Sequence, residues 1–277
     1  MKINYKSNKK IVILISLACV IACGFLVFFC ILISNKKKAT PIDLPVRIAL
    51  IDTGISENAI DSNFIETGYN YVNSNEDTVD LIGHGTAVAS IIAGSEIAGI
   101  EGLCNEIVLV PLVYSTLDED GNQKSVDVEV LSQMIRDAVD IYHCNIINIS
   151  SGIKTNNEQL RKSVEYAKEC GALIVSCAGN EGTTDIYYPG GYESVLCVGS
   201  LNKDLSQRAS FSQYNDTVDV LAPGEKVSAA TMKGNAFNVT GTSYAAAHVT
   251  GRAAAIWKAS PTLTNDEVKT KVIADLN

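Results

Sequence analysis

The stretch VRIALID, residues 46–52, decides the fold class. It is a short, almost continuously apolar run that ends in an aspartate. Further runs of this kind are IVLVPLVY at 107–114, NIINIS at 145–150 and ALIVSC at 172–177. Strands of a half-exposed sheet alternate polar and apolar residues, whereas parallel strands covered on both faces are apolar throughout. The pattern therefore predicts an α/β chain built on a mostly parallel sheet.

Segments with helical features separate these strands. Apolar or small residues at helical spacing, or runs rich in helix formers, predict helices over 84–94, 127–142, around 160–167, from 243 to the stop at Pro261, and over 264–274. Strands that alternate with helices predict a doubly wound sheet with helices on both faces, spanning residues 46–277. In such sheets, binding sites form beyond the carboxyl ends of the strands.

The first 45 residues divide into three segments. Residues 1–10 form a short basic tail, residues 11–33 contain no charged side chain, and residues 34–45 form a polar linker. About 20 apolar residues suffice to cross a bilayer as a helix, so we expect one N-terminal transmembrane helix over 11–33. A lipoprotein cleavage site at residues 20–23, VIAC, is the alternative. The expected location is the cell membrane, single-pass, with the folded domain extracytoplasmic.

Charge and cysteine content narrow the possible partners. Residues 1–40 hold seven lysines and no acid, so the remainder has 22 − 7 = 15 basic and 31 acidic residues, a net charge of −16. Such an acidic domain argues against nucleic-acid binding. It would attract basic peptides, although a solvated surface explains the same charge. The domain has five cysteines, an odd number without a C-x-x-C pair, so we expect no disulfide, metal or cofactor.

The stretch TGTSYAAAHVTG, residues 240–251, holds a serine at the predicted start of a helix. Ser243 or its neighbour Thr242 could cap that helix. Ser243 could instead be a nucleophile, which requires a base to take its proton. His248 on the same helix and His143 at a helix-to-strand link fit packing or surface roles. His84 lies between two glycines where a helix begins, and it is the candidate base.

Two more residues complete the candidate chemistry. A histidine base needs a carboxylate that fixes its tautomer, and Asp52 lies at the carboxyl end of the first strand. A developing oxyanion needs hydrogen-bond donors, and Asn180 follows the strand 172–177 among glycines. A turn aspartate and a turn asparagine are the alternative interpretations.

The order Asp, His, Asn, Ser resembles that of the subtilisin-like serine proteases. The segments that resemble the family are IALIDTGI, GHGTAVASIIAG, INISSG and GTSYAAAHVTG. The resemblance implies a serine endopeptidase with the triad Asp52, His84 and Ser243, and with Asn180 as oxyanion donor. It also implies that a peptide or protein substrate binds as an added strand, with substrate-binding residues Ser150, Ser151, Gly152 and Glu181.

The chain departs from the family pattern near the implied site. Tyr244 stands where a methionine is usual, and Ala247 where a proline is usual. Residues 93–104 are short where relatives carry a calcium loop, so we expect no calcium there. Glu181 and Asp185 near the expected specificity pocket would suit a basic substrate residue, and Tyr187 would narrow that pocket.

The short linker after the predicted anchor leaves no room for the folded prodomain of secreted relatives. We therefore expect a protease that processes secreted peptides at the membrane, for example a leader peptidase of the lanthipeptide type. Two alternatives stay open. One is a catalytically inactive relative that binds peptides or regulates a partner, and the other is a general degradative protease at the surface.

Overall fold

A computed structural model describes residues 41–43 and 45–276. The chain separates into two units, residues 1–40 and residues 41–277, and the description below concerns the second unit. The predicted tail, the anchor over 11–33 and most of the linker therefore lie outside the described residues. Within the described residues, no helix has the length and apolar character needed to cross a membrane.

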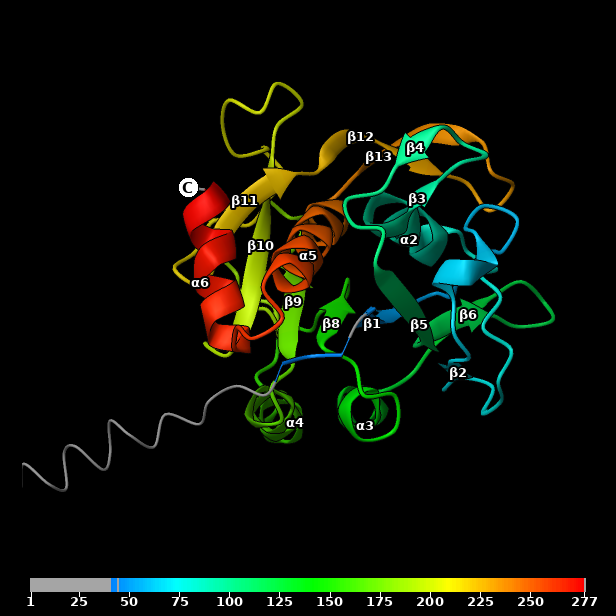
Figure 1. The fold of residues 1–277 in the computed structure, drawn as a ribbon, viewed down its shortest axis with the longest axis horizontal. Helices are drawn as coiled ribbons and strands as arrows, with labels where there is room; N and C mark the ends of the chain where they lie inside the picture. The colour runs from blue at the N-terminus through cyan, green and yellow to red at the C-terminus, as the bar shows by residue number, and fades with distance from the viewer. Residues whose placement is uncertain (1–40, 44, 277) are drawn as a thin grey trace, which may run out of the picture. The chain divides into compact units, whose positions relative to one another are not determined.

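A seven-stranded sheet forms the centre of this unit (Figure 1). Its strand order is β11-β10-β9-β8-β1-β5-β2, and every pairing is parallel. The strands are β1 (Val46–Asp52), β2 (Tyr69–Asn70), β5 (Ile107–Val113), β8 (Ile146–Ile149), β9 (Leu173–Cys177), β10 (Val195–Leu201) and β11 (Val220–Pro223). The doubly wound parallel sheet expected from the apolar runs is confirmed.

Helices cover both faces of this sheet. The helices are α2 (His84–Ala93), α5 (Thr242–Ala259) and α6 (Asn265–Leu276) on one face, and α3 (Val128–Asp140) and α4 (Glu158–Glu169) on the other (Figure 1). All five lie where the sequence predicts helices. The predicted boundaries differ by a few residues, as at α3, where the side chain of Asp127 caps the first turn.

Short elements join these layers. They are the 3-10 turn η1 (Ser62–Phe64) and three two-stranded ladders, β3 (Gly94–Ser95) with β4 (Ile100–Glu101), β6 (Ser115–Leu117) with β7 (Gln123–Ser125), and β12 (Glu225–Ala230) with β13 (Ala236–Thr240). Residues 93–104, where relatives carry a calcium loop, thus contain the β3–β4 hairpin. Among the described residues, no group of three or more His, Cys, Asp or Glu could hold a metal ion.

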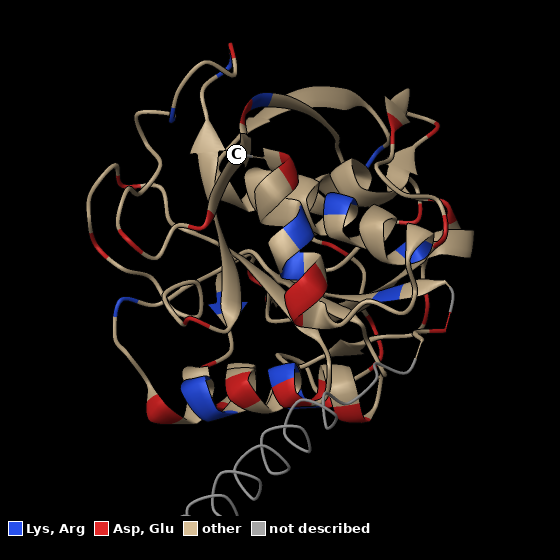
Figure 2. Cartoon of the chain, turned by 60° about the vertical axis from the view of Figure 1, so that its left-hand side comes forward, with Lys and Arg blue, Asp and Glu red and all other residues tan. Residues whose placement is uncertain are grey.

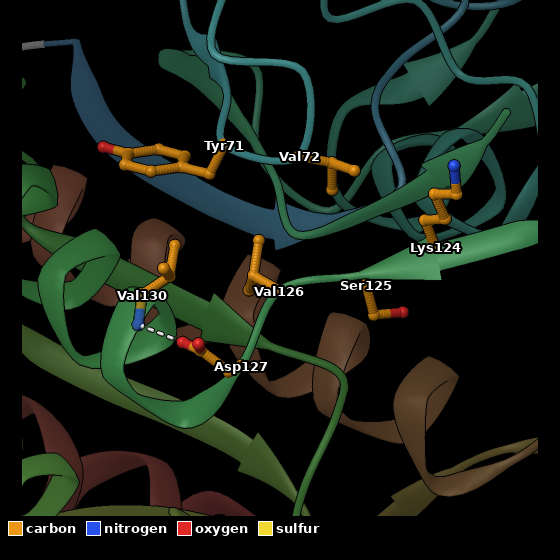
Figure 3. Close-up of a pocket in the computed structure, with 7 residues that line it drawn as sticks. All are labelled: Tyr71, Val72, Lys124, Ser125, Val126, Asp127 and Val130. Carbon is orange, nitrogen blue, oxygen red and sulfur yellow. Dashed lines mark hydrogen bonds between the residues drawn. The ribbon is translucent and has the colours of Figure 1, made fainter.

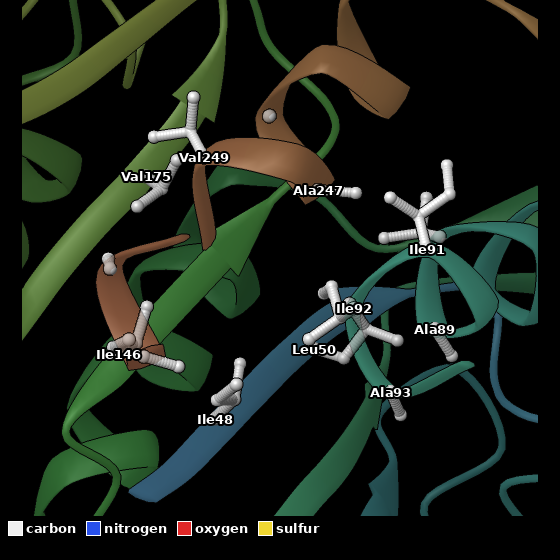
Figure 4. Close-up of a cluster of buried hydrophobic side chains, with 14 of the residues drawn as sticks. Ile48, Leu50, Ala89, Ile91, Ile92, Ala93, Ile146, Val175, Ala247 and Val249 are labelled. Atoms are coloured by element: carbon white, nitrogen blue, oxygen red, sulfur yellow. The ribbon is translucent and has the colours of Figure 1, made fainter. Parts of the chain in front are cut away.

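The apolar interior consists of two clusters, one on each face of the sheet. The larger cluster joins the sheet to α2 and α5, and Figure 4 shows Leu50 of β1 beside Ile92 of α2. The smaller cluster lies between the sheet and the helices α3 and α4. Charged residues are spread over the loops and helices of this unit (Figure 2), as expected of residue types that are mostly solvent-exposed. This layering fixes the carboxyl ends of the strands, where the candidate residues lie.

Candidate active site

The carboxyl edge of the sheet brings the candidate residues together. Asp52 is the last residue of β1, Ser150 follows β8, and Asn180 follows β9. The helices α2 and α5 begin at the same edge, and they carry His84 as first residue and Ser243 as second. Parallel strands end at a common edge, so residues far apart in sequence meet there.

Asp52 and His84 form a hydrogen-bonded pair. Asp52 Oδ1 lies 2.7 Å from His84 Nδ1 and also accepts the backbone N–H of Thr53 at 2.8 Å. Asp52 is fully buried, whereas the His84 side chain is 28% exposed. Gly85 makes this approach possible, because a Cβ there would lie 2.2 Å from the Gly54 carbonyl oxygen. The carboxylate thus fixes the orientation of the ring.

The environment raises the pKa of His84 above its usual value. Burial alone would lower the pKa, because it disfavours the charged imidazolium. The charge and hydrogen bond of Asp52 and the charge of Asp80 outweigh this effect. The pair is therefore arranged to stabilise a proton that the imidazole accepts.

Asp80 was not singled out from the sequence, yet it organises the loop before His84. Its carboxylate is 2% exposed and accepts five hydrogen bonds. The donors are Thr53 Oγ1, the N–H groups of Ile82 and Gly83, and the N–H and Oγ1 of Thr86. Helix α2 has no side-chain cap at Gly83, so Asp80 supplies that function from outside. The available signal was an aspartate four residues before the helix.

The structure corrects the capping interpretation of residues 242 and 243. Gly241 is the N-cap of α5, so neither the Thr242 nor the Ser243 hydroxyl is the N-cap group of this helix. The Ser243 hydroxyl instead donates to the Ser150 carbonyl at 3.2 Å, and the residue is 6% exposed. The ring of the next residue, Tyr244, packs 5.4 Å from the His84 ring. Ser243 thus lies in a buried position, one residue before a ring that packs against His84.

The amide of Asn180 is held in one orientation. Its Oδ1 accepts the N–H of Thr242 at 2.8 Å and the Thr242 hydroxyl at 2.9 Å. The Thr242 hydroxyl oxygen accepts the N–H of Gly179 at 3.2 Å. With its oxygen committed in this way, Asn180 presents its Nδ2 group as a donor beside the start of α5.

A buried polar chain fixes the segment after β8. Thr250 of α5 donates to Asn148 Oδ1 at 2.8 Å, and Asn148 Nδ2 donates to Ser150 Oγ at 3.0 Å. Ser151 is half-buried and Gly152 is exposed. Of these three expected substrate-binding residues, Ser150 contacts Ser243, and the other two follow it directly in the chain.

Glu181, the fourth expected substrate-binding residue, is exposed and directly follows Asn180. It is bound to Lys154 Nζ at 2.7 Å, and Asp185 is bound to the same ammonium group at 3.0 Å. The Lys154 ammonium lowers the pKa of Glu181. Both carboxylates expected to attract a basic substrate side chain are thus already paired.

The remaining histidines lie away from these contacts. His143 is exposed, with Nδ1 3.1 Å from the Val139 carbonyl oxygen. His248 is half-buried on α5, its Nε2 has no hydrogen-bond partner within the described residues, and burial lowers its pKa to about 4. Both positions agree with the surface and packing roles expected of them.

Cysteines 104, 144, 170, 177 and 197 are all free. Cys177 is the buried last residue of β9, and burial raises its pKa to about 11. A raised pKa disfavours the thiolate, which is the nucleophilic form of a cysteine.

A separate hollow lies between the loop after β2 and the start of α3 (Figure 3). It is lined by Tyr71, Val72, Lys124, Ser125, Val126, Asp127 and Val130. None of the candidate site residues lines it. The hollow is therefore not an extension of the site around Ser243.

Comparison with known proteins gives the family. The model of the subtilase family matches residues 45–276. A thermophilic serine proteinase of Bacillus sp. (strain AK1) is 35% identical over 232 residues, which cover 80% of this chain and 54% of that protein. The first relatives matched are longer proteins, of which the chain spans 54–60%.

Two solved structures show the same fold. Sphericase matches with a TM-score of 0.72 and 28% identity, over 86% of this chain and 84% of that chain. The prenylagaramide maturation protease PagA matches with a TM-score of 0.65 and 25% identity, over 80% of this chain and 77% of that chain. With the family model spanning the whole described sheet and its helices, the chain belongs to the subtilase family.

Proposed function

We propose that this protein is a serine endopeptidase whose triad is Asp52, His84 and Ser243. The observation that carries the proposal is the 2.7 Å hydrogen bond between buried Asp52 and His84, beside a helix start that holds Ser243. This arrangement supplies an oriented base next to a hydroxyl.

The reaction is acyl transfer. The Ser243 hydroxyl turns from the Ser150 carbonyl, and its oxygen attacks the peptide carbonyl carbon while His84 takes the proton. Asn180 Nδ2 donates to the oxyanion. The C–N bond then breaks as His84 returns the proton to the leaving amine, which leaves an acyl-enzyme. Water, deprotonated by His84, hydrolyses this ester and regenerates Ser243.

Labelling with a fluorophosphonate tests the nucleophile directly. The full-length chain should react through Ser243, and Ser243→Ala should not react. Circular dichroism of both proteins controls for folding. A folded parent that does not label would contradict the proposal and favour the alternative of an inactive peptide-binding relative.

The finer function we propose is processing of secreted peptides at the membrane. Similarity to a structure named as a maturation protease supports the processing role. The uncharged segment 11–33 supports anchoring. A processor cuts a leader peptide at one bond, whereas a degradative protease cuts unrelated unfolded proteins at many bonds. Mass spectrometry of digests of casein and of candidate leader peptides shows whether cleavage occurs at one bond or at many, and so separates these roles. The anchor is tested by extraction of cell membranes at alkaline pH, after which an anchored protein should stay in the membrane fraction.

A further inference from the structure

The space between the ends of β8 and β9 faces the proposed nucleophile. If the substrate carbonyl lies between Ser243 and Asn180, the N–H of the same substrate residue points toward the Ser150 carbonyl. That substrate residue supplies the acyl group, and we call it the acyl residue. In the proposal below, its side chain enters between segment 150–153 and segment 178–181, the two segments whose glycines contact Tyr187. What fills this space decides which acyl residues fit.

The side chain of Tyr187 occupies this space. A Cβ on Gly179 would lie 2.8 Å from Tyr187 Cδ2, and a Cβ on Gly152 would lie 3.3 Å from Tyr187 Cβ. The two glycines therefore do not leave an open slot between the strand ends, because the tyrosine packs against both of them.

Backbone hydrogen bonds hold Tyr187 in place. Its neighbour Tyr188 exchanges two bonds with Ile153, N–H to O at 2.8 Å and O to N–H at 2.9 Å. The carbonyl of Tyr187 accepts the N–H of Gly191 at 2.7 Å. The segment that carries the ring is thus paired to the segment after β8, and the ring packs between Gly152 and Gly179.

Lys154, Glu181 and Asp185 form an ion cluster at the outer edge of this space. Lys154 Nζ binds Glu181 at 2.7 Å and Asp185 at 3.0 Å, and it lies 5.4 Å from the centre of the Tyr187 ring. Each of these charged side chains is about half exposed, so a single pair contributes little to stability. The cluster nevertheless places a cation where a basic acyl residue would have to put its own.

We propose that Tyr187 and the Lys154 cluster restrict this protease to small acyl residues, namely glycine, alanine and serine. The proposal rests on the proposed peptidase function and adds its substrate class. A large apolar side chain has no slot to enter, and an arginine or lysine side chain meets a cation in place of a free carboxylate. This replaces the expectation of a basic acyl residue.

Hydrolysis of a peptide series by the full-length chain tests the proposal. The series uses one fluorogenic sequence in which only the acyl residue varies among Gly, Ala, Ser, Phe and Arg. For the unmodified protein, kcat/KM should be at least about tenfold higher with Ala than with Phe or Arg, since one misfitting apolar group changes kcat/KM by about 10–200-fold. Equal cleavage after Phe or Arg would overturn the proposal, whatever the variants do.

Two variants test the two parts of the restriction. Tyr187→Gly should raise kcat/KM for the Phe peptide about tenfold or more and change that for the Ala peptide little. Tyr187→Phe keeps the ring and is the matched control, which should keep the preference for Ala. Lys154→Met frees Glu181 and Asp185, and it should raise kcat/KM for the Arg peptide without helping the Phe peptide.

Fluorophosphonate labelling keeps the two hypotheses apart. A protein that labels at Ser243 but cleaves after Phe as well as after Ala retains the proposed function and refutes the inference. A folded protein that does not label refutes the function itself. If Tyr187→Gly folds and labels yet gains no activity on the Phe peptide, the ring does not set the preference.

Discussion

In the two helix layers, the pair α2 and α5 is buried more deeply than the pair α3 and α4. In α2, nine of ten residues are buried, and in α5 eleven of 18. In α3 and α4, only five of 13 and four of 12 are buried, and α6, at the end of the first layer, buries two of 12. The pair α2 and α5 consists largely of small residues and carries His84 and Ser243, whereas α3 and α4 are amphipathic and carry no candidate site residue. A catalytic site needs side chains that are held in fixed positions. The two candidate residues His84 and Ser243 accordingly lie on the helices that are packed against neighbouring elements on several sides.

The largest expected difference between the layers concerns their buried serines. Ser243→Ala should lower kcat by about 10⁶-fold, because no other described side chain can replace the nucleophile. Ser132→Ala on α3 removes an equally buried hydroxyl, one that bonds to the Val128 carbonyl at 2.7 Å. It should leave kcat unchanged within about twofold. Steady-state hydrolysis of a peptide amide by both variants measures kcat. A large loss of kcat in Ser132→Ala would show that the two layers do not differ in their contribution to catalysis.

The oxyanion donor gives the next largest effect. Asn180→Ala should lower kcat by about 10²–10³-fold with little change in KM, which is the size known for such a donor in a subtilisin. Thr242→Val removes the hydroxyl that bonds to Asn180 Oδ1 and should cause a smaller loss, since the backbone N–H of residue 242 still holds that oxygen. A KM effect without a kcat effect in Asn180→Ala would argue against oxyanion stabilisation.

Overpacking tests whether burial of α5 serves the site. Ala247 on α5 and Ala138 on α3 are both fully buried. Replacing either with leucine should lower the free energy of unfolding by about 1–3 kcal/mol. Only Ala247→Leu should also lower kcat, because a shift of α5 moves Ser243. Urea unfolding and kcat measured on both variants decide this, and equal losses of kcat would show that the two layers are not distinct.

The smallest effect concerns pH. His84 acts as a base only when neutral, and its pKa is raised, so activity should rise with pH through a midpoint above about 6.5. Asp80→Asn removes one of the charges that favour the imidazolium and should move the midpoint of kcat/KM to lower pH. On the acid side of the profile, the variant should therefore keep a larger fraction of its plateau activity than the parent.

The matched control for this shift is Asp140→Asn on α3, which removes a carboxylate bound to Tyr166 at 2.7 Å in the other layer. Its midpoint should equal that of the parent. A purely structural role for Asp80 would lower the plateau and leave the midpoint in place. The profile therefore separates loss of the loop geometry from loss of the charge.

The sequence by itself determined the layered architecture and the identity of the candidate residues. Continuous apolar runs such as 46–52 and 172–177 specify buried parallel strands, because burial on both faces demands apolar side chains throughout. Residues near each other in the chain set these patterns, so they can be read without knowing the fold. The positions of Asp52, His84, Asn180 and Ser243 at strand ends or helix starts follow in the same way.

Only the tertiary structure decided which side chains pair. Ser243 and Thr242 could equally have capped α5, yet contacts with residues 93 and 62 positions away in sequence direct their hydroxyls to Ser150 and Asn180. Lys154 likewise reaches Glu181 and Asp185 from another loop, and Tyr187 lies between glycines from two strand ends. The physical reason is that the spacing of apolar residues along the chain indicates which side chains are buried. The hydrogen-bond or ion-pair partner of a side chain depends instead on which separate segments of the chain meet in space.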